Sequence, residues 1–345
     1  ALASRALARA AAVAADTRVR RQNFLTLVSY SQEITVFISD ADVRKVLTFP
    51  DAVAAMTDAF RDAGTGGGAM QERVRTHGGG VSLSMMGAIL SGSGVMGAKV
   101  YSTVGGAFTF VLALFSNTDG RLIALLDGNA LTEFRTAAVT VVAADALARR
   151  DAGVLAVFGT GVQARAHLEA FLTTRSFRTV RIVGRTGAEA CAAWVRDSFG
   201  VDAAAVDAAA ALRDADIVVT ATRAREPLFA GDLVKPGAFV AAIGSSKPDT
   251  REIDAALLAR AGRIVVEWKQ QARREAGDLL LAGDAVDWEQ VDELGAIVAD
   301  PAVGRNDDGQ IIVYKSVGVG IEDVALANLV VRRLGSARGC MLGAD

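Results

Sequence analysis

The clearest pattern of apolar and polar positions in the chain lies between residues 154 and 172. Residues 154–158 form an unbroken apolar run, which is typical of a buried parallel strand. A turn with two glycines, residues 159–161, follows, and from Val162 the apolar positions recur at helical spacing. A second apolar run at residues 179–184 completes the strand–helix–strand unit from which parallel sheets are built.

The same alternation continues through the C-terminal half of the chain. Further strands are predicted at residues 217–222, 237–244, 263–267 and 310–315. Acidic helices lie between the last two strands, and residues 288–299 give the clearest helical pattern among them. Residues 321–334 predict a closing helix. Strands that alternate with helices indicate an α/β fold with a parallel sheet.

The N-terminal half has a different pattern, with two helices followed by short strands. Ser39 or Asp40 can cap the first helix, and Pro50 starts the second. Short apolar runs separated by turn residues then predict strands at residues 81–86, 96–101, 108–115 and 122–126. Residues 117–120 (Asn-Thr-Asp-Gly) are a hairpin turn signal. This region therefore predicts a mostly antiparallel sheet, distinct from the parallel one.

A long helix is predicted over residues 131–149, directly after the turn at residues 127–129. Arg135 lies in its first turns, and a guanidinium beside a helix N-terminus suits a carboxylate ligand. The alternative is an ion pair between Arg135 and a neighbouring acid such as Glu133.

Composition and charge narrow the classes of function. A net charge of −2 argues against nucleic acid as the main partner, and no apolar run is long enough to span a bilayer. Cys191 and Cys340 lack metal-ligand spacing, which predicts reduced thiols in a cytoplasmic enzyme. With only two histidines, His77 and His167, a zinc site is not expected.

Residues 1–34 differ from the rest and are predicted to be an extension outside the fold. Residues 1–21 are rich in Ala and Arg, with Asp16 as their one acid. This composition resembles an organellar transit peptide or an upstream extension, and an exposed Ala-rich helix is the alternative.

The turn after the first parallel strand carries a dinucleotide-binding pattern. Gly159, Gly161 and Ala164 form Gly-x-Gly-x-x-Ala, in which backbone can approach a pyrophosphate at the helix N-terminus. The expected cofactor contacts along this turn are Gly159, Thr160, Gly161, Val162, Gln163 and Ala164. Thr220, Ala221 and Thr222 end another strand and should lie at the same edge, because ligands bind at the carboxyl ends of such strands. A glycine turn in some other α/β domain is the alternative.

The end of the second strand predicts the type of cofactor. Sites that select NAD usually carry an Asp or Glu here, whereas this chain has Gly184, Arg185 and Thr186. An arginine can pair with the 2′-phosphate of NADP(H), which is therefore preferred, with NAD(H) possible. The alternative is a solvent-facing Arg185.

Several stretches together resemble one family, the ornithine cyclodeaminase/mu-crystallin family, over roughly residues 35–335. They are residues 97–100 (Gly-Ala-Lys-Val), 131–138 (Leu-Thr-Glu-Phe-Arg-Thr-Ala-Ala), 159–164 (Gly-Thr-Gly-Val-Gln-Ala) and 315–318 (Lys-Ser-Val-Gly), followed by Glu322 and Asp323. The resemblance implies a Rossmann domain (residues 151–317) inserted into an α+β substrate-binding and dimerisation domain (residues 35–150 and 318–345). It also implies a homodimer that uses a nicotinamide cofactor on an amino acid or its imine.

The resemblance implies roles for individual residues. Arg135 matches the family's carboxylate-binding arginine, and Lys99 matches the pocket lysine, which either donates a proton or only holds the carboxylate. Arg73 matches the second substrate arginine by its spacing to Met86. Arg75 is a competitor, because Val-Arg-Thr at residues 74–76 also resembles the mu-crystallin stretch.

Three further positions are assigned through the same match. Val317 and Gly318, in the last matching stretch, are expected to contact the cofactor. Together with Arg73, Lys99 and Arg135, the hydroxyl-bearing Ser246 is expected to contact the substrate.

Ser246 separates two branches of the family. In cyclodeaminases an aspartate in the loop after this strand is the catalytic acid/base, and Ser246 occupies its place here. A hydroxyl cannot manage a proton at neutral pH as a carboxylate can. Residues 246–249 (Ser-Lys-Pro-Asp) resemble the Ser-Arg-Pro-Asp of mu-crystallin, a ketimine reductase. Residues 184–186 (Gly-Arg-Thr) likewise match its Asn-Arg-Thr.

The resulting prediction is an NADPH-linked reductase of small imine carboxylates. Cyclic substrates such as Δ1-pyrroline-2-carboxylate or Δ1-piperideine-2-carboxylate would give L-amino acids such as proline, with the proton from Lys99 or a bound water. Alternatives are an ornithine cyclodeaminase with bound NAD, an amino-acid dehydrogenase acting on a 2-oxo acid, and a non-catalytic binding role.

Overall fold

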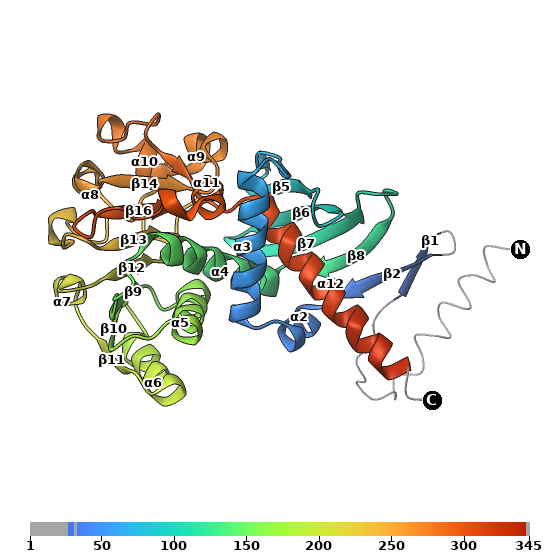
Figure 1. Cartoon of the computed structure of the whole chain (residues 1–345), viewed down its shortest axis with the longest axis horizontal. Helices are drawn as coiled ribbons and strands as arrows, with labels where there is room; N and C mark the ends of the chain where they lie inside the picture. Colours follow the sequence, from blue (N-terminus) through green and yellow to red (C-terminus); the bar gives the residue numbers. More distant parts are fainter. Residues whose placement is uncertain (1–26, 31–32, 343–345) are drawn as a thin grey trace, which may run out of the picture.

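The structure, a computed structural model, describes residues 27–30 and 33–342, with side chains described for residues 36–335. Within this part of the chain the strands form two eight-stranded sheets. Figure 1 shows the sheets in separate halves of the molecule, with helices α3, α4 and α12 between or across them. The predicted transit peptide, residues 1–21, lies outside the described residues.

The first sheet is mostly antiparallel, as predicted. Its order is β1-β2-β8-β7-β6-β5-β3, β4 also pairs with β5, and of the described pairs β2 with β8 is parallel. Its strands are β1 (Leu27–Tyr30), β2 (Glu33–Ile38), β3 (Gly68–Met70), β4 (Val74–Gly78), β5 (Val81–Leu90), β6 (Val95–Val104), β7 (Ala107–Ser116) and β8 (Leu122–Asp127). Because β1 pairs with β2, strand pairing begins inside the stretch predicted to be an extension.

The two faces of the first sheet have different surroundings. Met86 and Lys99 lie opposite each other on one face, and helix α12 (Gly320–Leu342) packs across part of that face. Gly97 permits this close packing, because a Cβ there would stand 3.3 Å from Val324 of α12 and 2.6 Å from Ala113 O. We call this the inner face.

The opposite face, which we call the outer face, is apolar and exposed. Its exposed apolar side chains are Val74, Val81, Leu83, Met85, Ile89, Val100, Val104 and Val111. The strand register places them together, since Met85, Val100 and Val111 are directly opposite one another on three neighbouring strands. A hollow of about 620 Å³ opens on this face beside Met96 and Phe115.

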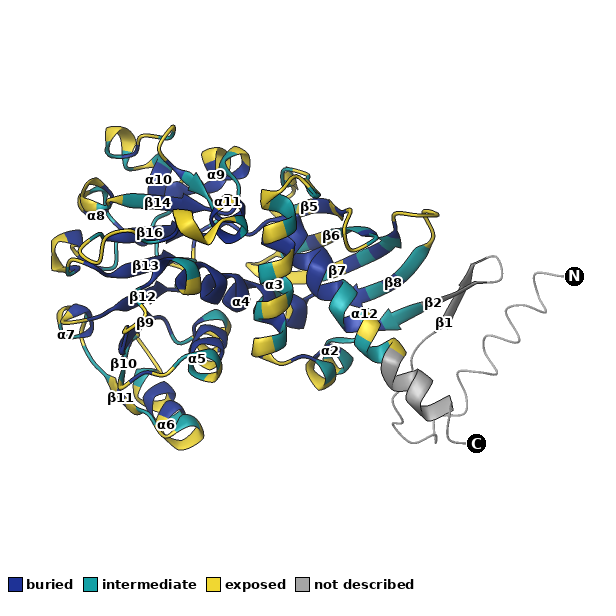
Figure 2. Cartoon of the chain, viewed as in Figure 1, coloured by how far each residue is buried: buried dark blue, intermediate teal, exposed yellow. Residues whose placement is uncertain are grey.

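Three helices pack beside the first sheet: α2 (Asp40–Val46), α3 (Phe49–Gly64) and α4 (Asn129–Leu147). Ser39 and Thr48 cap α2 and α3 through their hydroxyls, as polar residues before an apolar pattern predict. Helix α4 is buried on nearly all sides, as its dark colour in Figure 2 shows, because α3 and α5 both pack against it. No helix of the described residues has the length and hydropathy to cross a membrane.

The second sheet is parallel in all its described pairs, with the order β11-β10-β9-β12-β13-β16-β14-β15. Its strands are β9 (Val154–Phe158), β10 (Thr179–Val183), β11 (Asp202–Ala205), β12 (Ile217–Thr220), β13 (Phe239–Ala242), β14 (Arg263–Val266), β15 (Asp292–Glu293) and β16 (Ile312–Lys315). Strand order reverses between β9 and β12, which is where doubly wound sheets bind ligands. The predicted α/β fold, with a Rossmann-type sheet inserted between α4 and α12, is confirmed.

The helices of this half are α5 (Val162–Thr174), α6 (Ala188–Phe199), α7 (Ala208–Leu212), α8 (Ala255–Arg260), α9 (Lys269–Glu275), α10 (Gly277–Leu280) and α11 (Leu294–Ala299). Helix α11 packs directly on α3 of the first half, where a Cβ at Gly64 would lie 2.1 Å from Gly295 O. This contact needs glycine and fixes the two halves against each other.

One predicted helix is wrong in its first half. Only Leu294–Ala299 of residues 288–299 is helical. Asp287 instead accepts hydrogen bonds from Glu289 N (3.0 Å) and Gln290 Nε2 (2.9 Å), which makes a turn, and Asp292–Glu293 then pairs with β14. Local side-chain hydrogen bonds and strand pairing therefore override the helical pattern in the first half of this segment.

Candidate active site

The turn between β9 and α5 has the geometry that a dinucleotide pyrophosphate requires. Gly159 has a φ of 123°, and a Cβ there would lie 2.6 Å from Ala221 O. Gly161 caps α5 without a side chain, and a Cβ at Gly161 would meet nothing within 4 Å. The first backbone N–H groups of α5, beginning at the exposed Val162, therefore have no side-chain partner. These residues fit the phosphates of a dinucleotide.

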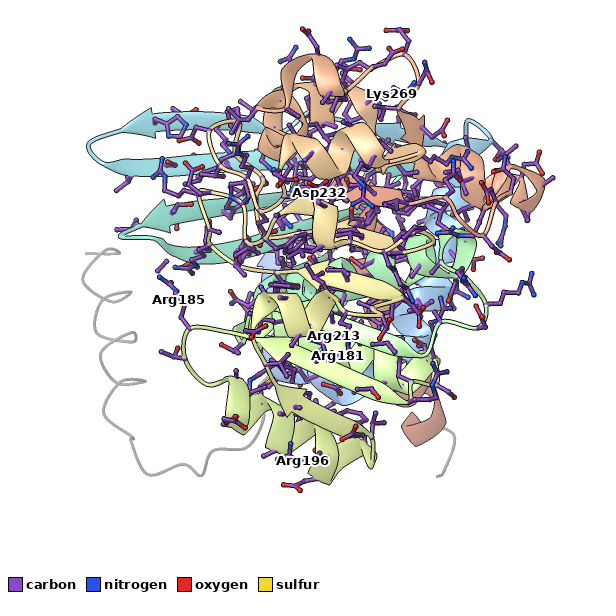
Figure 3. All side chains as sticks on the ribbon, turned by 90° about the vertical axis from the view of Figure 1, so that its left-hand side faces the viewer. Arg181, Arg185, Arg196, Arg213, Asp232 and Lys269 are labelled. Atoms are coloured by element: carbon purple, nitrogen blue, oxygen red, sulfur yellow. The ribbon has the colours of Figure 1, made fainter. Side chains whose placement is uncertain are left out.

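The neighbouring turn after β10 is held against this one. The Thr160 hydroxyl donates to Thr186 O at 2.9 Å, and a Cβ at Gly184 would stand 2.6 Å from the Thr160 methyl group. Arg185 is exposed and makes no ion pair with any described residue. Figure 3 shows it on its loop at the edge of the sheet, apart from Arg181. Arg185 and Thr186 therefore lie beside the dinucleotide turn, and the guanidinium is free to meet a ligand.

Gln163 connects the dinucleotide turn to the first half of the molecule. Its Nε2 donates to Thr132 O on α4 at 3.3 Å, while its buried Oε1 has no hydrogen-bond partner among the described residues. Ala164 is buried beneath the turn, and one turn further His167 hydrogen bonds Thr140 at 3.0 Å. Burial lowers the pKa of His167 to about 4, so the imidazole is neutral and structural.

Glu252 holds the ends of β12 and β13 together. Its carboxylate accepts from the Thr220 hydroxyl (2.8 Å), Gly244 N (2.6 Å), and both the backbone N and the hydroxyl of Thr222 (2.7 Å each). Thr220 and Thr222 are therefore at the predicted edge, but their hydroxyls are used by Glu252. Ala221 is the member of this trio that touches Gly159. Sequence reasoning missed Glu252, which lies in a loop with no distinguishing pattern.

A second missed group, Lys315, lies beneath the same loops. Its fully buried ammonium is 2.8 Å from Asp278 Oδ2 and donates to Ser245 O (2.6 Å) and Ala242 O (3.2 Å). Asp278 in turn accepts from Glu252 N at 2.6 Å. This network fixes the loop that carries Ser246.

The predicted substrate cations converge at the N-termini of α4 and α12. Lys99 Nζ lies 2.7 Å from Asp323 Oδ1 and 3.4 Å from the Thr132 hydroxyl. Arg135 Nη1 lies 2.5 Å from Glu322 Oε2, and its Nε is 3.4 Å from Asp323. The alternative ion pair with Glu133 is not formed, because Glu133 pairs with Arg44. These carboxylates, Glu322 and Asp323, belong to the matching stretch at the start of α12.

Arg73 reaches the same place from the gap between β3 and β4. Its Nη1 lies 2.5 Å from Glu275 Oε2, and its Nη2 donates to Val317 O (2.8 Å) and Gly318 O (3.0 Å). Gly318 has a φ of 74°, and a Cβ there would stand 2.5 Å from Arg135 Nη1. Val317 and Gly318, expected at the cofactor, are therefore also the segment that separates and supports the two arginines.

Arg75 and Ser246 meet at the side of this cluster. Arg75 Nη1 lies 2.7 Å from Glu275 Oε1, and its Nη2 donates to Ser246 O at 3.1 Å. The Arg75 side chain is 22% exposed, whereas that of Arg73 is 4% exposed. The structure thus brings Arg73, not its competitor, into the buried cluster, and uses Arg75 to tie the first sheet to the Ser246 loop.

Two buried guanidinium nitrogens in the cluster make no hydrogen bond to a described residue: Arg73 Nε, and Arg135 Nε, which has only an ion-pair contact of 3.4 Å with Asp323 Oδ1. A buried N–H group without a hydrogen bond costs free energy, so its presence here points to a ligand that supplies the missing acceptor. A carboxylate has the charge and the two oxygens that guanidinium groups prefer.

Burial also shifts two pKa values in the cluster. Desolvation lowers the pKa of Lys99 to about 8, although the Asp323 carboxylate opposes the shift. Desolvation likewise raises the pKa of Glu322 to about 7, with Arg135 opposing it and the nearby Glu267 adding to it. Groups that change protonation near neutral pH are the kind that move protons in catalysis.

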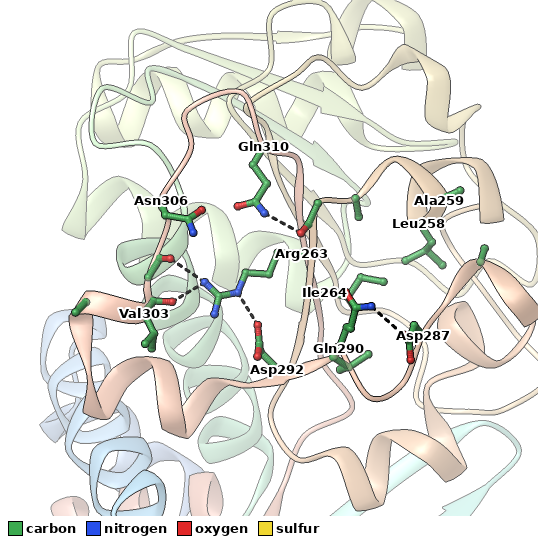
Figure 4. Close-up of a pocket in the computed structure, with 16 residues that line it drawn as sticks. Leu258, Ala259, Arg263, Ile264, Asp287, Gln290, Asp292, Val303, Asn306 and Gln310 are labelled. Atoms are coloured by element: carbon green, nitrogen blue, oxygen red, sulfur yellow. Dashed lines mark hydrogen bonds and ion pairs between the residues drawn. The ribbon is translucent and has the colours of Figure 1, made fainter.

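A hollow away from this cluster lies at the opposite edge of the second sheet. It has a volume of about 650 Å³ and is shown in Figure 4. Its polar groups satisfy one another: Arg263 binds Asp292 and the carbonyls of Val303 and Gly304. It opens at the amino ends of β14 and β16, so it is separate from the dinucleotide edge.

The fold and this cluster define a dinucleotide-binding protein of the Rossmann class with a buried cluster of ion pairs beside the cofactor edge. The chain belongs to the ornithine cyclodeaminase/mu-crystallin family, whose model matches residues 33–338.

Two curated relatives are similar to most of the chain. Ketimine reductase mu-crystallin of Mus musculus is 37% identical over 219 residues, covering 63% of this chain and 67% of the relative. Delta(1)-pyrroline-2-carboxylate reductase of Bacillus cereus is 36% identical over 224 residues, covering 62% of this chain and 67% of the relative.

Solved structures agree over 88% of this chain. A probable ornithine cyclodeaminase from Bordetella pertussis is 46% identical, with a TM-score of 0.86 over 98% of its chain. The Delta(1)-pyrroline-2-carboxylate reductase of Thermococcus litoralis, in complex with NADH and L-proline, is 26% identical, with a TM-score of 0.82 over 98%. An archaeal alanine dehydrogenase dimer with bound NAD is 27% identical, with a TM-score of 0.83 over 97%.

Proposed function

We propose that this protein is an NAD(P)H-dependent reductase of small ketimine carboxylates, such as the cyclic imines Δ1-pyrroline-2-carboxylate and Δ1-piperideine-2-carboxylate. The observation that carries the proposal is the buried cluster of Lys99, Arg73 and Arg135, with two unpartnered guanidinium donors, beside a dinucleotide turn. The mouse and Bacillus relatives, which are named for reduction of C=N bonds, support the same chemistry.

The two arginines bind the substrate carboxylate. Arg135 Nε and Arg73 Nε supply hydrogen bonds that no described residue accepts, and their partners Glu322 and Glu275 keep the guanidinium planes in place. This orients the imine carbon toward the ends of β9 and β12. The turn between β9 and α5 would hold a nicotinamide cofactor, which would supply a hydride to the imine carbon while the C=N π electrons move to nitrogen.

The nitrogen needs one proton to complete the amine. Lys99 is suited to hold that proton, because its pKa of about 8 leaves it charged at neutral pH yet able to give the proton up. Asp323 keeps the ammonium in place at 2.7 Å. The Ser246 hydroxyl, in the loop tied down by Arg75, contacts the substrate but does not act as its acid.

The cofactor we propose is NADP(H), on the basis of Arg185 and Thr186. No carboxylate is present at Gly184–Thr186 to repel a 2′-phosphate, and the exposed Arg185 guanidinium is without an ion-pair partner in the described chain. Two of the solved relatives hold NADH and NAD, so use of NAD(H) is the alternative.

The assembly we propose is a homodimer formed through the outer face of the first sheet. The exposed apolar side chains of this face lie on four neighbouring strands, and contiguous apolar patches of this kind mark protein interfaces. The archaeal alanine dehydrogenase relative is a dimer, which is consistent with this proposal. The domain division at residues 150 and 318 belongs to the same proposal.

Ornithine cyclodeamination is the second candidate, favoured by the 46% identity to the Bordetella structure. Ser246 counts against it, because that reaction moves several protons and the position lacks a carboxylate. An amino-acid dehydrogenase acting on 2-oxo acids is a third.

One screen distinguishes the candidates. The purified protein is mixed with NADPH or NADH and Δ1-pyrroline-2-carboxylate, Δ1-piperideine-2-carboxylate, or 2-oxo acids with ammonia, and loss of nicotinamide absorbance is followed. Ornithine with NAD is assayed for ammonia and proline. We expect NADPH loss with the cyclic imines. Ammonia release from ornithine at a comparable rate would refute the reductase proposal.

A further inference from the structure

On the inner face of the first sheet, a row of four residues runs across strands β4 to β7, two positions along β6 from Lys99. The polarity of the side chains changes along this row. On β4 and β5 this row holds Arg75 and Ser84, which are directly opposite each other. On β6 and β7 it holds Tyr101 and Phe110, again directly opposite each other. One half of the row is therefore polar and the other half aromatic.

The aromatic half is a continuous surface. Phe108 lies one row further on the same face, and its ring stacks near that of Phe110, with centroids 5.7 Å apart and planes at 13°. Tyr101 lies 5.0 Å from Phe110 and 6.2 Å from Phe108. We call these three residues the aromatic wall. Phe108 is 46% exposed, so the end of the wall formed by Phe108 is open to solvent in the single chain.

The wall borders the substrate cluster. Lys99 Nζ, which Asp323 and Thr132 hold, lies 5.4 Å from the centre of the Phe110 ring. The polar half of the same row is already occupied, since Arg75 spans it to reach Ser246 O. A substrate whose carboxylate is bound by the buried arginines thus has the aromatic half of the row available for its remaining atoms.

The wall is separate from the outer face of the proposed dimer. Side chains alternate along a strand, so Phe108 and Phe110 point to the face opposite that of Val111 and Val100. Dimer contacts made through the outer face would therefore leave the aromatic wall uncovered.

We propose that the aromatic wall binds the side chain of the substrate, and that this side chain is a hydrocarbon or aryl group. This rests on the proposed reductase function and names its substrate class: 2-imino acids with bulky apolar side chains, favoured over imines of small or acidic 2-oxo acids. Burial of an apolar side chain against aromatic rings contributes favourable binding free energy. An acidic side chain would instead lose its hydration without gaining a hydrogen-bond partner on the wall.

The test is a series of ketimines formed from methylamine and pyruvate, 2-oxohexanoate, phenylpyruvate or oxaloacetate, with Δ1-pyrroline-2-carboxylate as a common reference. The kcat/KM for each is measured with NADPH. We expect the phenylpyruvate ketimine to exceed the pyruvate ketimine by about tenfold or more, and the oxaloacetate ketimine to be poorest.

Substitutions in the aromatic wall test whether it causes the preference for the phenylpyruvate ketimine. Phe108→Ala and Phe110→Leu should reduce the phenylpyruvate-to-pyruvate ratio several-fold. Phe199→Ala, which removes a comparable ring at the end of α6, should leave the ratio unchanged. Because Phe108 is exposed, its variant tests the proposal even if the Phe110 variant does not fold.

The outcomes separate the two proposals. If Δ1-pyrroline-2-carboxylate is reduced but the series is flat, or the variants keep the ratio, the wall does not bind the side chain, while the reductase function stands. A weaker NADPH Kd in both wall variants with an unchanged ratio assigns the wall to the cofactor and overturns the proposal. If no imine is reduced, both proposals fail.

Discussion

Lys99 and Asp323 form an ion pair of 2.7 Å in which both side chains are almost completely buried. They come from β6 and from the start of α12, so the pair joins the sheet to the helix that closes the fold. Without Asp323, burial and the positive charges of Arg135 and Arg73 would act on the ammonium unopposed, and the pKa of Lys99 would fall below its present value of about 8. Asp323 is therefore expected to keep Lys99 charged at neutral pH.

Replacing Asp323→Asn should move the pH dependence of the reaction. If Lys99 donates the proton, kcat/KM for imine reduction falls as pH rises through the Lys99 pKa, near pH 8 in the native protein. Loss of the carboxylate should shift this fall to lower pH by about one unit or more, since one unit corresponds to about 1.4 kcal/mol. The measurement is a pH–rate profile of both proteins with the same cyclic imine.

The imine also titrates, but its contribution is the same for both proteins and cancels in the difference. An unchanged falling limb in the Asn variant would show that Lys99 only holds the carboxylate.

Arg135→Ala should remove most of the transition-state binding. The change leaves Glu322 buried without its cation and the substrate carboxylate without a partner, which costs on the order of 2–5 kcal/mol in kcat/KM. Far-UV circular dichroism and NADPH affinity should be close to those of the native protein. Native-like kcat/KM would remove Arg135 from the substrate site.

A charge on the outer face should break the proposed dimer. Leu83 is 55% exposed and lies among the apolar residues of β4 to β7, so Leu83→Asp places an unpaired carboxylate in that contact. Light scattering should show a monomer, or a dimer that dissociates at micromolar concentration. Leu233→Asp, at a 48% exposed leucine of the second half, is the matched control. A stable Leu83→Asp dimer would mean that another surface is used.

The parallel sheet could be predicted because its signals are local. The apolar run at residues 154–158, the glycines after it and the helix from Val162 each depend on neighbours in sequence, and β9 and α5 begin where predicted. The helix predicted at residues 288–299 failed because Asp287 and the pairing of Asp292 with Val265 on β14 compete with it. The pairing of Asp292 with β14 joins segments that are distant in sequence, and the periodicity of apolar positions does not reveal such contacts.

For the same reason, the basic residues of the site were predicted but their acidic partners were not. The cations Arg73, Lys99 and Arg135 were found through a family resemblance, and the structure brings them together. Glu275, the partner of Arg73, was missed because it is a single acid in a short helix whose other charged residues are basic, and it becomes significant only when folding places it 2.5 Å from Arg73. Glu252 was missed likewise, since three of its four acceptor contacts come from Thr220 and Thr222 at the end of β12, at least 30 residues earlier in the sequence.

We predict that cofactor choice depends on Arg185, because this exposed side chain lies beside the dinucleotide turn and has no ion-pair partner among the described residues. A charge-assisted pair with a 2′-phosphate, together with the Thr186 hydroxyl, should favour NADPH over NADH by roughly 1.5–3 kcal/mol, or about tenfold to a hundredfold in kcat/KM. Arg185→Asp should reverse this preference, since an aspartate accepts from ribose hydroxyls and repels a phosphate.

The measurement is kcat/KM for both cofactors in both proteins, with one cyclic imine at saturation. Arg181→Asp is a control for the charge change, because Arg181 lies in β10, the strand that leads to Arg185, but hydrogen bonds the carbonyls of Ala210 and Ala211 away from the turn. A native protein that prefers NADH would refute the NADP(H) assignment. An Arg185→Asp variant that still prefers NADPH would show that the preference arises elsewhere, and that Arg185 is a surface residue without contact to the cofactor.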